Sequence, residues 1–386
     1  MKKLKKALIH DWYAGYTGAE KCIESITNIW PDFDHYTLID TLSEEERTKV
    51  LKGKKTNTSF IENLPFGKKK YRVYLPFFPF AIEQFDLTEY DIIISSSSSI
   101  AKGVLTRSDQ LHISYVHSPI RYAWDLYFQY LNESGLNRGL KGFFAKYILH
   151  RIRIWDVSTA NRPDFYIANS NYVAARIKKT YGKDSIVLYP PVDITNFKVS
   201  DEKKDYYITF SRMVPYKKID IIVEAFSSTN KKLLVIGDGP DLKKIKKLSS
   251  QNIKLLGYLP KLEMIELLQK AKAFIFAAEE DFGIAPVEAQ ACGIPVIAFG
   301  KGGILETIKG VFPHEDSVLD KTGVFFKKQN AQSILNAITF FEKHEKEFDK
   351  QQIRANAENF SKEIFEKKFE ETVFNLYEKW KNDRLI

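Results

Sequence analysis

The stretch of sequence that decides the fold is 279–296, which reads EEDFGIAPVEAQACGIPV. It follows the apolar run 273–276 and leads into a second apolar run, so its order is strand, loop, helix and strand. Pro286 suits a first helical turn, and Gly293 suits the end of a helix. Free amide groups at a helix N-terminus beside a glycine can bind phosphate. The stretch therefore predicts a strand–helix–strand unit with an anion-binding loop.

Similar apolar runs occur along the whole chain and fall into two sets, each alternating with amphipathic helical patterns. This alternation indicates parallel sheets that are covered on both faces. We predict an α/β fold of two Rossmann-like domains whose parallel sheets face a central cleft, because open α/β sheets bind ligands at the carboxyl ends of their strands. The predicted strands are 6–10, 90–95, 111–116, 165–168 and 185–189 in the first set, and 205–210, 232–237, 253–256, 273–276 and 295–298 in the second.

The boundary between the two domains is predicted after Pro190 and Pro191, which are followed by the charged run 200–205. A length of 386 residues suits two domains. We assign 1–198 to an N-terminal acceptor-side domain and 199–364 to a C-terminal domain that binds the donor. The stretch from 331 to 381 reads as almost continuous helix, and its last part, about 365–386, is assigned to the first domain.

Composition excludes several classes of protein. A content of 44% hydrophobic and 28% charged residues is that of a globular protein rather than a disordered one. Cys22 and Cys292 are the only cysteines, which excludes a disulfide scaffold and a cysteine zinc site. No run reaches about 18 apolar residues, and the lysine-rich start meets His10 and Asp11 before an apolar segment develops. We expect a cytosolic protein or one bound to a membrane surface.

The charge balance leaves the partner open. The net charge is +9 and 14% of the residues are aromatic, a combination that suits nucleic acid, anionic lipid or phosphorylated small molecules. A nucleic-acid-binding protein is disfavoured because it would need a basic-aromatic recognition module, and the basic residues here fall on loops of an α/β framework. An NAD-dependent oxidoreductase is disfavoured because no G-x-G-x-x-G follows a strand.

Two glutamates, Glu280 and Glu288, flank the Phe282-Gly283 pair, and the pattern closes with E-A-x-A-x-G-x-P-V. This stretch resembles the signature of glycosyltransferase family 4, whose members are retaining enzymes of the GT-B fold that use nucleotide-sugar donors. The resemblance implies that Glu288 binds the ribose hydroxyls and that Glu280, with the backbone of Phe282 and Gly283, orients the sugar. The family commonly has methionine where Gln290 stands.

A second segment, 210–220, carries Arg212 and Lys217 directly after a strand. These two cations can converge on a diphosphate, the arginine through its planar fork and the lysine as a point charge. The segment resembles the family pattern G/S-R-x-x-x-x-K-G, in which the basic pair holds the donor's pyrophosphate. Lys218 stands where the family has glycine, so Lys217 is the predicted ligand.

The loop 11–21 after the first strand contains glycines that would let the backbone approach a ligand before a helix begins. Family members usually have a Gly-Gly pair here, and Thr17-Gly18 matches it in part. Gly18 is therefore the predicted contact, ahead of Gly15. Amides near Gly18, Gly283 and Ile284 would then stabilise the negative charge of the leaving diphosphate.

A fourth segment, 115–125, reads YVHSPIRYAWD, with His117 at the end of a strand. It resembles a bacterial mannosyltransferase subgroup of lipopolysaccharide and polysaccharide synthesis. The resemblance implies that His117 contacts the donor sugar near the reaction centre, so His117 and Glu280 are the predicted catalytic residues. The predicted acceptor-side residues are Arg121, Tyr122 and Trp124. The subgroup often has histidine where Ser98 stands.

The resemblance implies transfer of a hexose, with mannose from GDP-mannose favoured, onto a lipid-linked saccharide in cell-surface polysaccharide synthesis. A UDP-sugar transferase of the same family and a sugar-nucleotide epimerase of the same fold stay open as alternatives. No Asp-x-Asp arrangement is seen at a strand end, so we expect transfer without a metal or other cofactor.

A membrane partner is predicted from two basic and aromatic segments. The segment 66–80 places four basic residues beside a dense aromatic run, and 136–155 holds five more basic residues and no acid. Such segments suit an anionic membrane surface, here the cytosolic face of the inner membrane for a peripheral enzyme. The alternative is that the aromatics belong to the core and the basic groups are merely solvated. The predicted membrane residues are Lys68, Lys69, Lys70 and Arg72.

Overall fold

The computed structural model describes residues 4–315 and 317–384, which form two compact units. The first unit is Met1–Pro191 with Glu363–Ile386, and the second is Val192–Lys362. The division differs by a few residues from the bounds 1–198 and 199–364. Val192 already belongs to the second unit, because its N–H donates to Phe360 O at 2.9 Å and it forms a β-bridge with Ser361. The two prolines, rather than the charged run after them, therefore mark the boundary.

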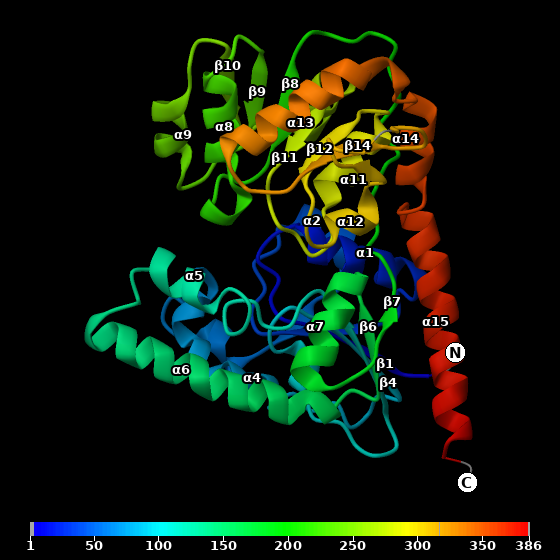
Figure 1. Ribbon diagram of the computed structural model, residues 1–386. Helices are drawn as coiled ribbons and strands as arrows, with labels where there is room; N and C mark the ends of the chain where they lie inside the picture. The colour runs from blue at the N-terminus through cyan, green and yellow to red at the C-terminus, as the bar shows by residue number, and fades with distance from the viewer. Residues whose placement is uncertain (1–3, 316, 385–386) are drawn as a thin grey trace. The chain divides into compact units, whose positions relative to one another are not determined.

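The first unit is built on a sheet of seven parallel strands in the order β3-β2-β1-β4-β5-β6-β7 (Figure 1). Strand order reverses between β1 and β4, and ligands of open α/β sheets bind at such a reversal. The strands are β1 (Lys6–His10), β2 (Asp34–Thr37), β3 (Thr56–Thr58), β4 (Ile92–Ser97), β5 (Leu111–Val116), β6 (Phe165–Ala168) and β7 (Ile186–Val187).

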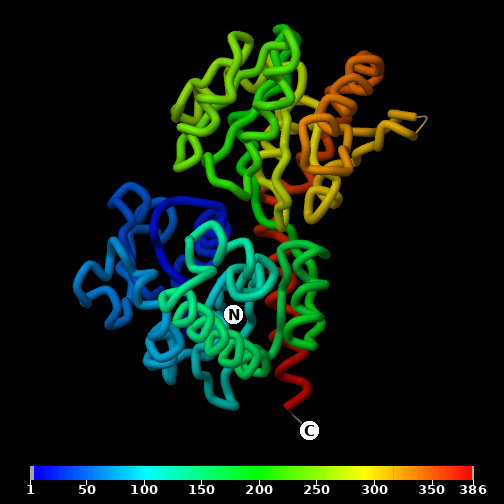
Figure 2. The backbone as a smooth tube through the Cα atoms, turned by 60° about the vertical axis from the view of Figure 1, so that its left-hand side comes forward, coloured from blue at the N-terminus to red at the C-terminus, as the bar shows by residue number. Residues whose placement is uncertain are grey.

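Helices cover both faces of this sheet. On one face, Ile23 and Ile26 of α1 and Phe365 and Phe369 of the C-terminal helix α15 pack into one buried cluster. Figures 1 and 2 both show α15 beside this unit. On the other face, α4 contributes Phe78 to a second cluster. The helices are α1 (Gly18–Ile29), α2 (Glu44–Leu51), α3 (Gly67–Lys70), α4 (Phe78–Ile82), α5 (Tyr127–Glu133), α6 (Gly139–Ser158), α7 (Asn171–Tyr181) and α15 (Lys362–Asn382).

The second unit repeats this topology with a sheet of order β10-β9-β8-β11-β12-β14-β13, again parallel throughout. Here the reversal lies between β8 and β11. The strands are β8 (Tyr207–Phe210), β9 (Leu233–Ile236), β10 (Ile253–Gly257), β11 (Phe274–Phe276), β12 (Val296–Phe299), β13 (Gly310–Val311) and β14 (Gly323–Phe326). The helices are α8 (Ile219–Ser227), α9 (Leu242–Leu248), α10 (Lys261–Gln269), α11 (Ile284–Ala291), α12 (Ile304–Thr307), α13 (Ala331–His344) and α14 (Lys350–Glu358).

The predicted α/β class with two Rossmann-like domains is confirmed, but the sequence patterns missed β2, β3, β13 and β14. β2 and β3 read DHYT and TNT and lack an apolar run, and β13 has two residues. β14 reads GVFF and is buried, but it is short and follows a polar loop. Within the described ranges, no helix combines the length and the apolar character that crossing a membrane requires.

Candidate active site

Two segments that the sequence singled out separately meet in the second unit. Lys217 follows β8 and Glu280 follows β11, and these strands are parallel neighbours at the point where the order reverses. Lys217 Nζ lies 2.5 Å from Glu280 Oε1, and the two side chains are 20% and 19% exposed. A cation and a carboxylate are thus held together, partly shielded from water, at the edge where ligands of this sheet type bind.

The backbone distinguishes Lys217 from Lys218. Lys218 has φ 57 and ψ 34 and is the N-cap of α8, a left-handed conformation that favours glycine. This explains why a glycine would suit the position. The ammonium of Lys217 lies over the rings of Tyr216 and Phe276, at 5.5 and 5.9 Å from their centroids. Arg212, the other predicted diphosphate ligand, is exposed in the same loop.

The loop that carries Arg212 is packed against the loop after β9. The N–H of Met213 donates to Asp238 O at 2.8 Å. A Cβ on Gly237 or Gly239 would collide with the carbonyl oxygen of Ser211 or Met213, and both glycines have positive φ. Only glycine therefore allows the two loops to approach this closely, and the approach fixes the backbone from which Arg212 projects.

The acidic loop is anchored on its other side by the segment after β12. Glu280 forms a β-bridge with Gly302, and the N–H of Gly303 donates to Glu280 O at 2.8 Å. Gly283 has φ 98 and is the N-cap of α11. The helix begins at Ile284, slightly before the predicted start at Pro286.

Glu288 and Glu280 occupy different surroundings. Glu288 lies within α11 and is 7% exposed, whereas Glu280 is in the loop and half-buried. Phe282 is buried and packs its ring edge-on against Phe360, with centroids 5.5 Å apart. The separation of the two acids along one loop and helix is compatible with the two roles that the resemblance implies. Those roles stay predictions.

Gln290 connects α11 with its neighbours. Its Nε2 donates to Thr307 O at 2.9 Å, and its Oε1 accepts from Asn356 Nδ2 at 2.7 Å. It is fully buried. The glutamine in place of methionine is therefore matched by polar partners inside the unit.

In the first unit, His117 stands directly after β5. Its Nε2 lies 2.8 Å from Ser96 Oγ at the end of β4, and its ring meets Tyr115 edge-on at 5.2 Å between centroids. Burial, together with the nearby charge of His10, lowers the pKa of His117 to about 3. The imidazole is neutral at physiological pH.

Asp11, which sequence reasoning left without a role, ties the loops after β1 and β4 together. Its buried carboxylate accepts from Ser98 N at 2.6 Å, Ser98 Oγ at 2.9 Å, Ile100 N at 2.7 Å and Ala101 N at 2.8 Å. The sequence feature that could have indicated this role is an aspartate directly after the first strand.

The two glycines of the loop 11–21 differ in backbone conformation. Gly15 has φ 131, whereas Gly18 is the first residue of α1, so Gly15 is the position that requires a glycine for its backbone.

The predicted acceptor-side residues lie in the segment that follows β5. Tyr122 OH is 2.8 Å from Ser99 Oγ, and the indole N–H of Trp124 donates to Asp156 Oδ2 at 2.8 Å. Asp156 is buried and paired with Lys102 at 2.8 Å, a contact that the sequence did not indicate. Arg121 is half-buried. The polar atom of Trp124 is therefore used inside the fold.

The predicted membrane residues are all exposed, Lys68, Lys69 and Lys70 in α3 and Arg72 in the 3-10 helix Tyr71–Phe77. Lys68 pairs with Glu62 at 2.7 Å. The aromatic run divides between core and surface, with Tyr71 and Phe78 buried and Phe66, Phe77 and Phe80 exposed. Helix α6 also exposes large apolar side chains, at Leu140, Phe143, Phe144, Tyr147, Ile154 and Val157.

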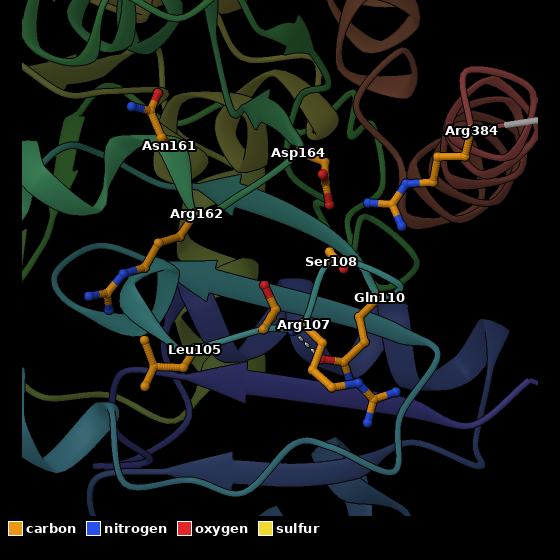
Figure 3. Close-up of a pocket in the computed structure, with 9 residues that line it drawn as sticks. Leu105, Arg107, Ser108, Gln110, Asn161, Arg162, Asp164 and Arg384 are labelled. Carbon is orange, nitrogen blue, oxygen red and sulfur yellow. Dashed lines mark hydrogen bonds between the residues drawn. The ribbon is translucent and has the colours of Figure 1, made fainter. Parts of the chain in front are cut away.

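A pocket of about 390 Å³ lies away from these residues, beside the amino-terminal ends of β5 and β6 (Figure 3). Arg162 pairs there with Glu83 and Arg107 with Asp109, at 2.6 and 2.8 Å. Figure 3 shows the guanidinium of Arg162 pointing away from Asp164 and Arg384. The pocket is lined by Leu105, Thr106, Arg107, Ser108, Gln110, Asn161, Arg162, Asp164 and Arg384.

The described residues contain no group of three or more His, Cys, Asp or Glu side chains placed to hold a metal ion.

Comparison with known proteins agrees with these motifs. The profile "Glycosyltransferase Family 4" matches 17–196, and "Glycosyl transferases group 1" matches 193–360. A GDP-mannose-dependent monoacylated alpha-(1-6)-phosphatidylinositol monomannoside mannosyltransferase of Corynebacterium glutamicum is 37% identical over 114 residues, which are 25% of this chain and 30% of that protein. N-acetyl-alpha-D-glucosaminyl L-malate synthase of Bacillus anthracis is 27% identical over 299 residues, 68% of this chain and 75% of that protein.

Among solved structures, Anabaena HepE in complex with UDP and glucose superposes with a TM-score of 0.68 at 18% identity, covering 96% of this chain and 100% of that one. The match to the first relative covers less than a third of its length, so its specificity does not transfer with the similarity. The two family profiles adjoin and together span most of the sequence, each over one of the two units. The chain belongs to glycosyltransferase family 4 and has the two-domain GT-B fold.

Proposed function

We propose that this glycosyltransferase moves mannose from GDP-mannose, with retention of configuration, onto a lipid-linked saccharide. The observation that carries the proposal is the contact of 2.5 Å between Lys217 and Glu280 at the reversal point of the second sheet. It joins a cation suited to a diphosphate with a carboxylate suited to sugar hydroxyls. The Corynebacterium relative described as GDP-mannose-dependent supports the choice of donor.

The donor's diphosphate would bind Arg212, Lys217 and the amides near Gly283 and Ile284. Lys217 is balanced by Glu280, so a bound diphosphate would compete for its ammonium and leave the carboxylate to accept from sugar hydroxyls. Glu288, buried in α11, would accept from the ribose hydroxyls. Each of these proposed contacts is a charge-assisted hydrogen bond, which is stronger than a hydrogen bond between two neutral groups.

In the reaction, the bond from the anomeric carbon to the phosphate oxygen breaks and a bond to an acceptor hydroxyl forms. The transition state resembles an oxocarbenium ion, and negative charge develops on the leaving diphosphate. Arg212 and Lys217 would stabilise that charge as preorganised donors. The leaving phosphate oxygen would take the proton of the acceptor hydroxyl on the same face of the sugar, which retains configuration.

His117, Gly18 and the acceptor-side residues lie in the first unit. A neutral His117 can donate one hydrogen bond to the donor sugar near its anomeric carbon without adding positive charge there. Arg121, Tyr122 and Trp124 would line the acceptor's path, Trp124 through the face of its indole, since its N–H is bound to Asp156.

The lipid-linked acceptor would be reached from the membrane surface. Lys68, Lys69, Lys70 and Arg72 are exposed beside exposed Phe66 and Phe77, a combination that suits an anionic leaflet. We place the enzyme at the cytosolic face of the inner membrane, in cell-surface polysaccharide synthesis.

The proposal is tested by a panel of nucleoside diphosphates and their sugars. GDP should raise the melting temperature more than UDP or ADP, because a ligand that binds only the native state stabilises it. GDP-mannose with a lipid-linked saccharide should then yield a longer saccharide. Preference for UDP, the nucleotide bound to the HepE structure, would favour the alternative UDP-sugar transferase. An epimer formed from the donor alone would favour the epimerase.

A further inference from the structure

Behind His117 lies a chain of buried polar groups, His10, Glu20 and Ser96, to which the sequence analysis assigned no role. His10, the last residue of β1, has Nδ1 3.1 Å from Ser96 O and Nε2 3.4 Å from Glu20 Oε1. Ser96 Oγ in turn lies 2.8 Å from His117 Nε2. His10 and Glu20 are 2% and 3% exposed. The four residues come from β1, α1, β4 and the end of β5, so the fold itself assembles them.

Both ring nitrogens of His10 face acceptors. A carbonyl oxygen can only accept, so Nδ1 must carry a proton to bond with Ser96 O, and an ionised carboxylate likewise requires a proton on Nε2. Glu20 is kept ionised by Thr17, whose N and Oγ1 donate to Glu20 Oε2 at 2.9 and 2.5 Å. His10 therefore satisfies both contacts only as an imidazolium.

The pKa directions agree with this assignment. Burial opposes a charge on His10, but the hydrogen bond and charge of Glu20, the charge of Asp11 and the bond to Ser96 O outweigh it, and the pKa of His10 is raised. Burial opposes ionisation of Glu20 as well, yet its bonds to His10 and Thr17 prevail and its pKa is lowered. Both directions favour the His10–Glu20 ion pair.

A positive His10 affects the proton of His117. Both rings reach Ser96, His10 through the carbonyl oxygen and His117 through the hydroxyl, so Nε2 of His117 is turned toward the charge. A lone pair facing a cation is favoured over an N–H dipole facing it. The hydroxyl of Ser96 then donates to Nε2, and the single proton of His117 sits on Nδ1.

Other groups around the pair do not replace this effect. The ring of Tyr13 lies tilted against that of His10, with centroids 5.0 Å apart, and its hydroxyl is 3.4 Å from Nδ1 of buried His35 on β2. Desolvation first, then the charges of Lys54 and His10, lowers the pKa of His35 to about 3. The carboxylate of Asp11 accepts hydrogen bonds from the amides after β4 and from Ser98 Oγ. Glu20 is thus the carboxylate in direct contact with His10.

We propose that Glu20 and His10 are positioning residues that act through Ser96 to hold His117 as a neutral imidazole with its proton on Nδ1. This inference rests on the proposed function for its catalytic meaning. A neutral ring can donate from Nδ1 to a sugar oxygen, whereas an imidazolium would place a positive charge beside an oxocarbenium-like centre and slow its formation.

The test uses the full-length, ligand-free protein labelled with ¹⁵N-histidine, in which long-range ¹H–¹⁵N spectra distinguish the two tautomers and the imidazolium. The chain has seven histidines, and His10→Asn and His117→Asn assign the two signals. We expect a doubly protonated His10 at pH 7 and a His117 in the Nδ1–H form that does not titrate above about pH 5. A His117 in the Nε2–H form, or one that titrates near the usual value of about 6.5, overturns the proposal.

Glu20→Gln removes the charge but keeps the capping box at the start of α1, because glutamine serves equally at that position. His10 should become neutral at pH 7, and the pKa of His117 should rise, because the positive charge of His10 that lowers it is lost and outweighs the accompanying loss of the Glu20 charge, which acts in the opposite direction. Glu24→Gln is the matched control, a buried glutamate one turn further along α1 that Tyr16 contacts at 2.5 Å. Unchanged His10 and His117 signals in Glu20→Gln also overturn the proposal.

The kinetic arm links this arrangement to turnover. The acid limb of kcat should move to higher pH in Glu20→Gln and stay in place in Glu24→Gln, with thermal unfolding confirming that both variants are folded. A uniform loss of kcat at all pH values would mean that Glu20 is merely structural. The spectra need no substrate. If the spectra behave as expected and no nucleotide sugar is used, the proposed function fails and the proton assignment stands.

Discussion

The two sheets share one strand order, yet the residues at their reversal points differ in kind. In the first unit, β1 and β4 end in His10 and in Ser95, Ser96 and Ser97, all of them buried. In the second, β8 and β11 end in Phe210 and Phe276, and the charged groups lie beyond them in loops. Topology thus sets where a ligand can bind, and the side chains decide whether polar groups sit inside the sheet edge or project from it.

This difference predicts that donor binding depends on a few projecting charges of the second unit. Lys217→Ala and Arg212→Ala should each lower kcat/KM by about 10² to 10³, the usual cost of losing a preorganised donor to developing charge. Lys218→Ala should cost far less. Lys218→Gly, which suits the left-handed backbone at φ 57, should also raise stability. Steady-state kinetics on the four variants measure this, and equal losses at positions 217 and 218 would contradict the choice of Lys217.

The two acids of the second unit should separate binding from turnover. Glu288→Ala should weaken the binding of a nucleoside diphosphate even when no sugar is attached, by about tenfold for a lost charge-assisted hydrogen bond. Glu280→Ala should spare that binding, or strengthen it by releasing Lys217, and should lower kcat with the complete donor. Calorimetric titration of the diphosphate and kinetics with the sugar donor are compared. Loss of diphosphate binding in both variants would contradict the division of roles.

The candidate site of the second unit could be predicted from sequence more completely than that of the first unit, because its charged groups project from loops. The site segments of the second unit are contiguous loops, so Arg212, Lys217, Glu280 and Glu288 stand out by their spacing. The Lys217–Glu280 contact could not be predicted, because it depends on β8 and β11 being neighbours although β9 and β10 lie between them in the sequence.

In the first unit the polar groups come from separate strands. His10, Ser96 and His117 meet only when β1, β4 and β5 pair, and Asp11 finds its partners after β4. Lys102 and Asp156 are likewise distant in sequence and form a buried pair. The short polar strands β2 and β3 were missed for a simpler reason, since their residues carry no apolar periodicity.

The surfaces of the two units provide a further contrast. Neutralising Lys68, Lys69, Lys70 and Arg72 together should weaken binding to anionic vesicles by tenfold or more, since each basic group contributes about 1 kcal/mol near such a surface. A matched control is the neutralisation of Lys243, Lys244, Lys246 and Lys247 on α9 of the second unit, which also removes four charges. Sedimentation with anionic and neutral vesicles at low and high salt measures binding. Equal loss in both variants would mean that net charge, not this surface, binds the membrane.

The last contrast concerns acid stability, and it follows from the buried histidines of the first unit. Burial is the main cause that lowers the pKa of His35, His112 and His117 to about 3. As pH falls below about 6.5, the unfolded chain binds protons at these sites and the folded unit does not, so its free energy of unfolding falls toward pH 3. His10, whose pKa is raised, acts in the opposite direction near neutral pH, because its protonation stabilises the folded unit and this contribution is complete below about pH 6.5.

In the second unit, His314 is exposed and His344 is half-buried. Hydrogen exchange between pH 7 and 4.5, corrected for the intrinsic rate, should therefore show β2 and β5 losing protection before β8 and β11. His112→Asn tests the cause, because Ser95 Oγ already lies 2.9 Å from the ring and can bond to the amide in its place. The variant should be less stable at pH 7 but less sensitive to acid. Equal loss of protection in both sheets would show that the histidines do not set the acid response, and the contrast between the two reversal points would then be confined to ligand binding.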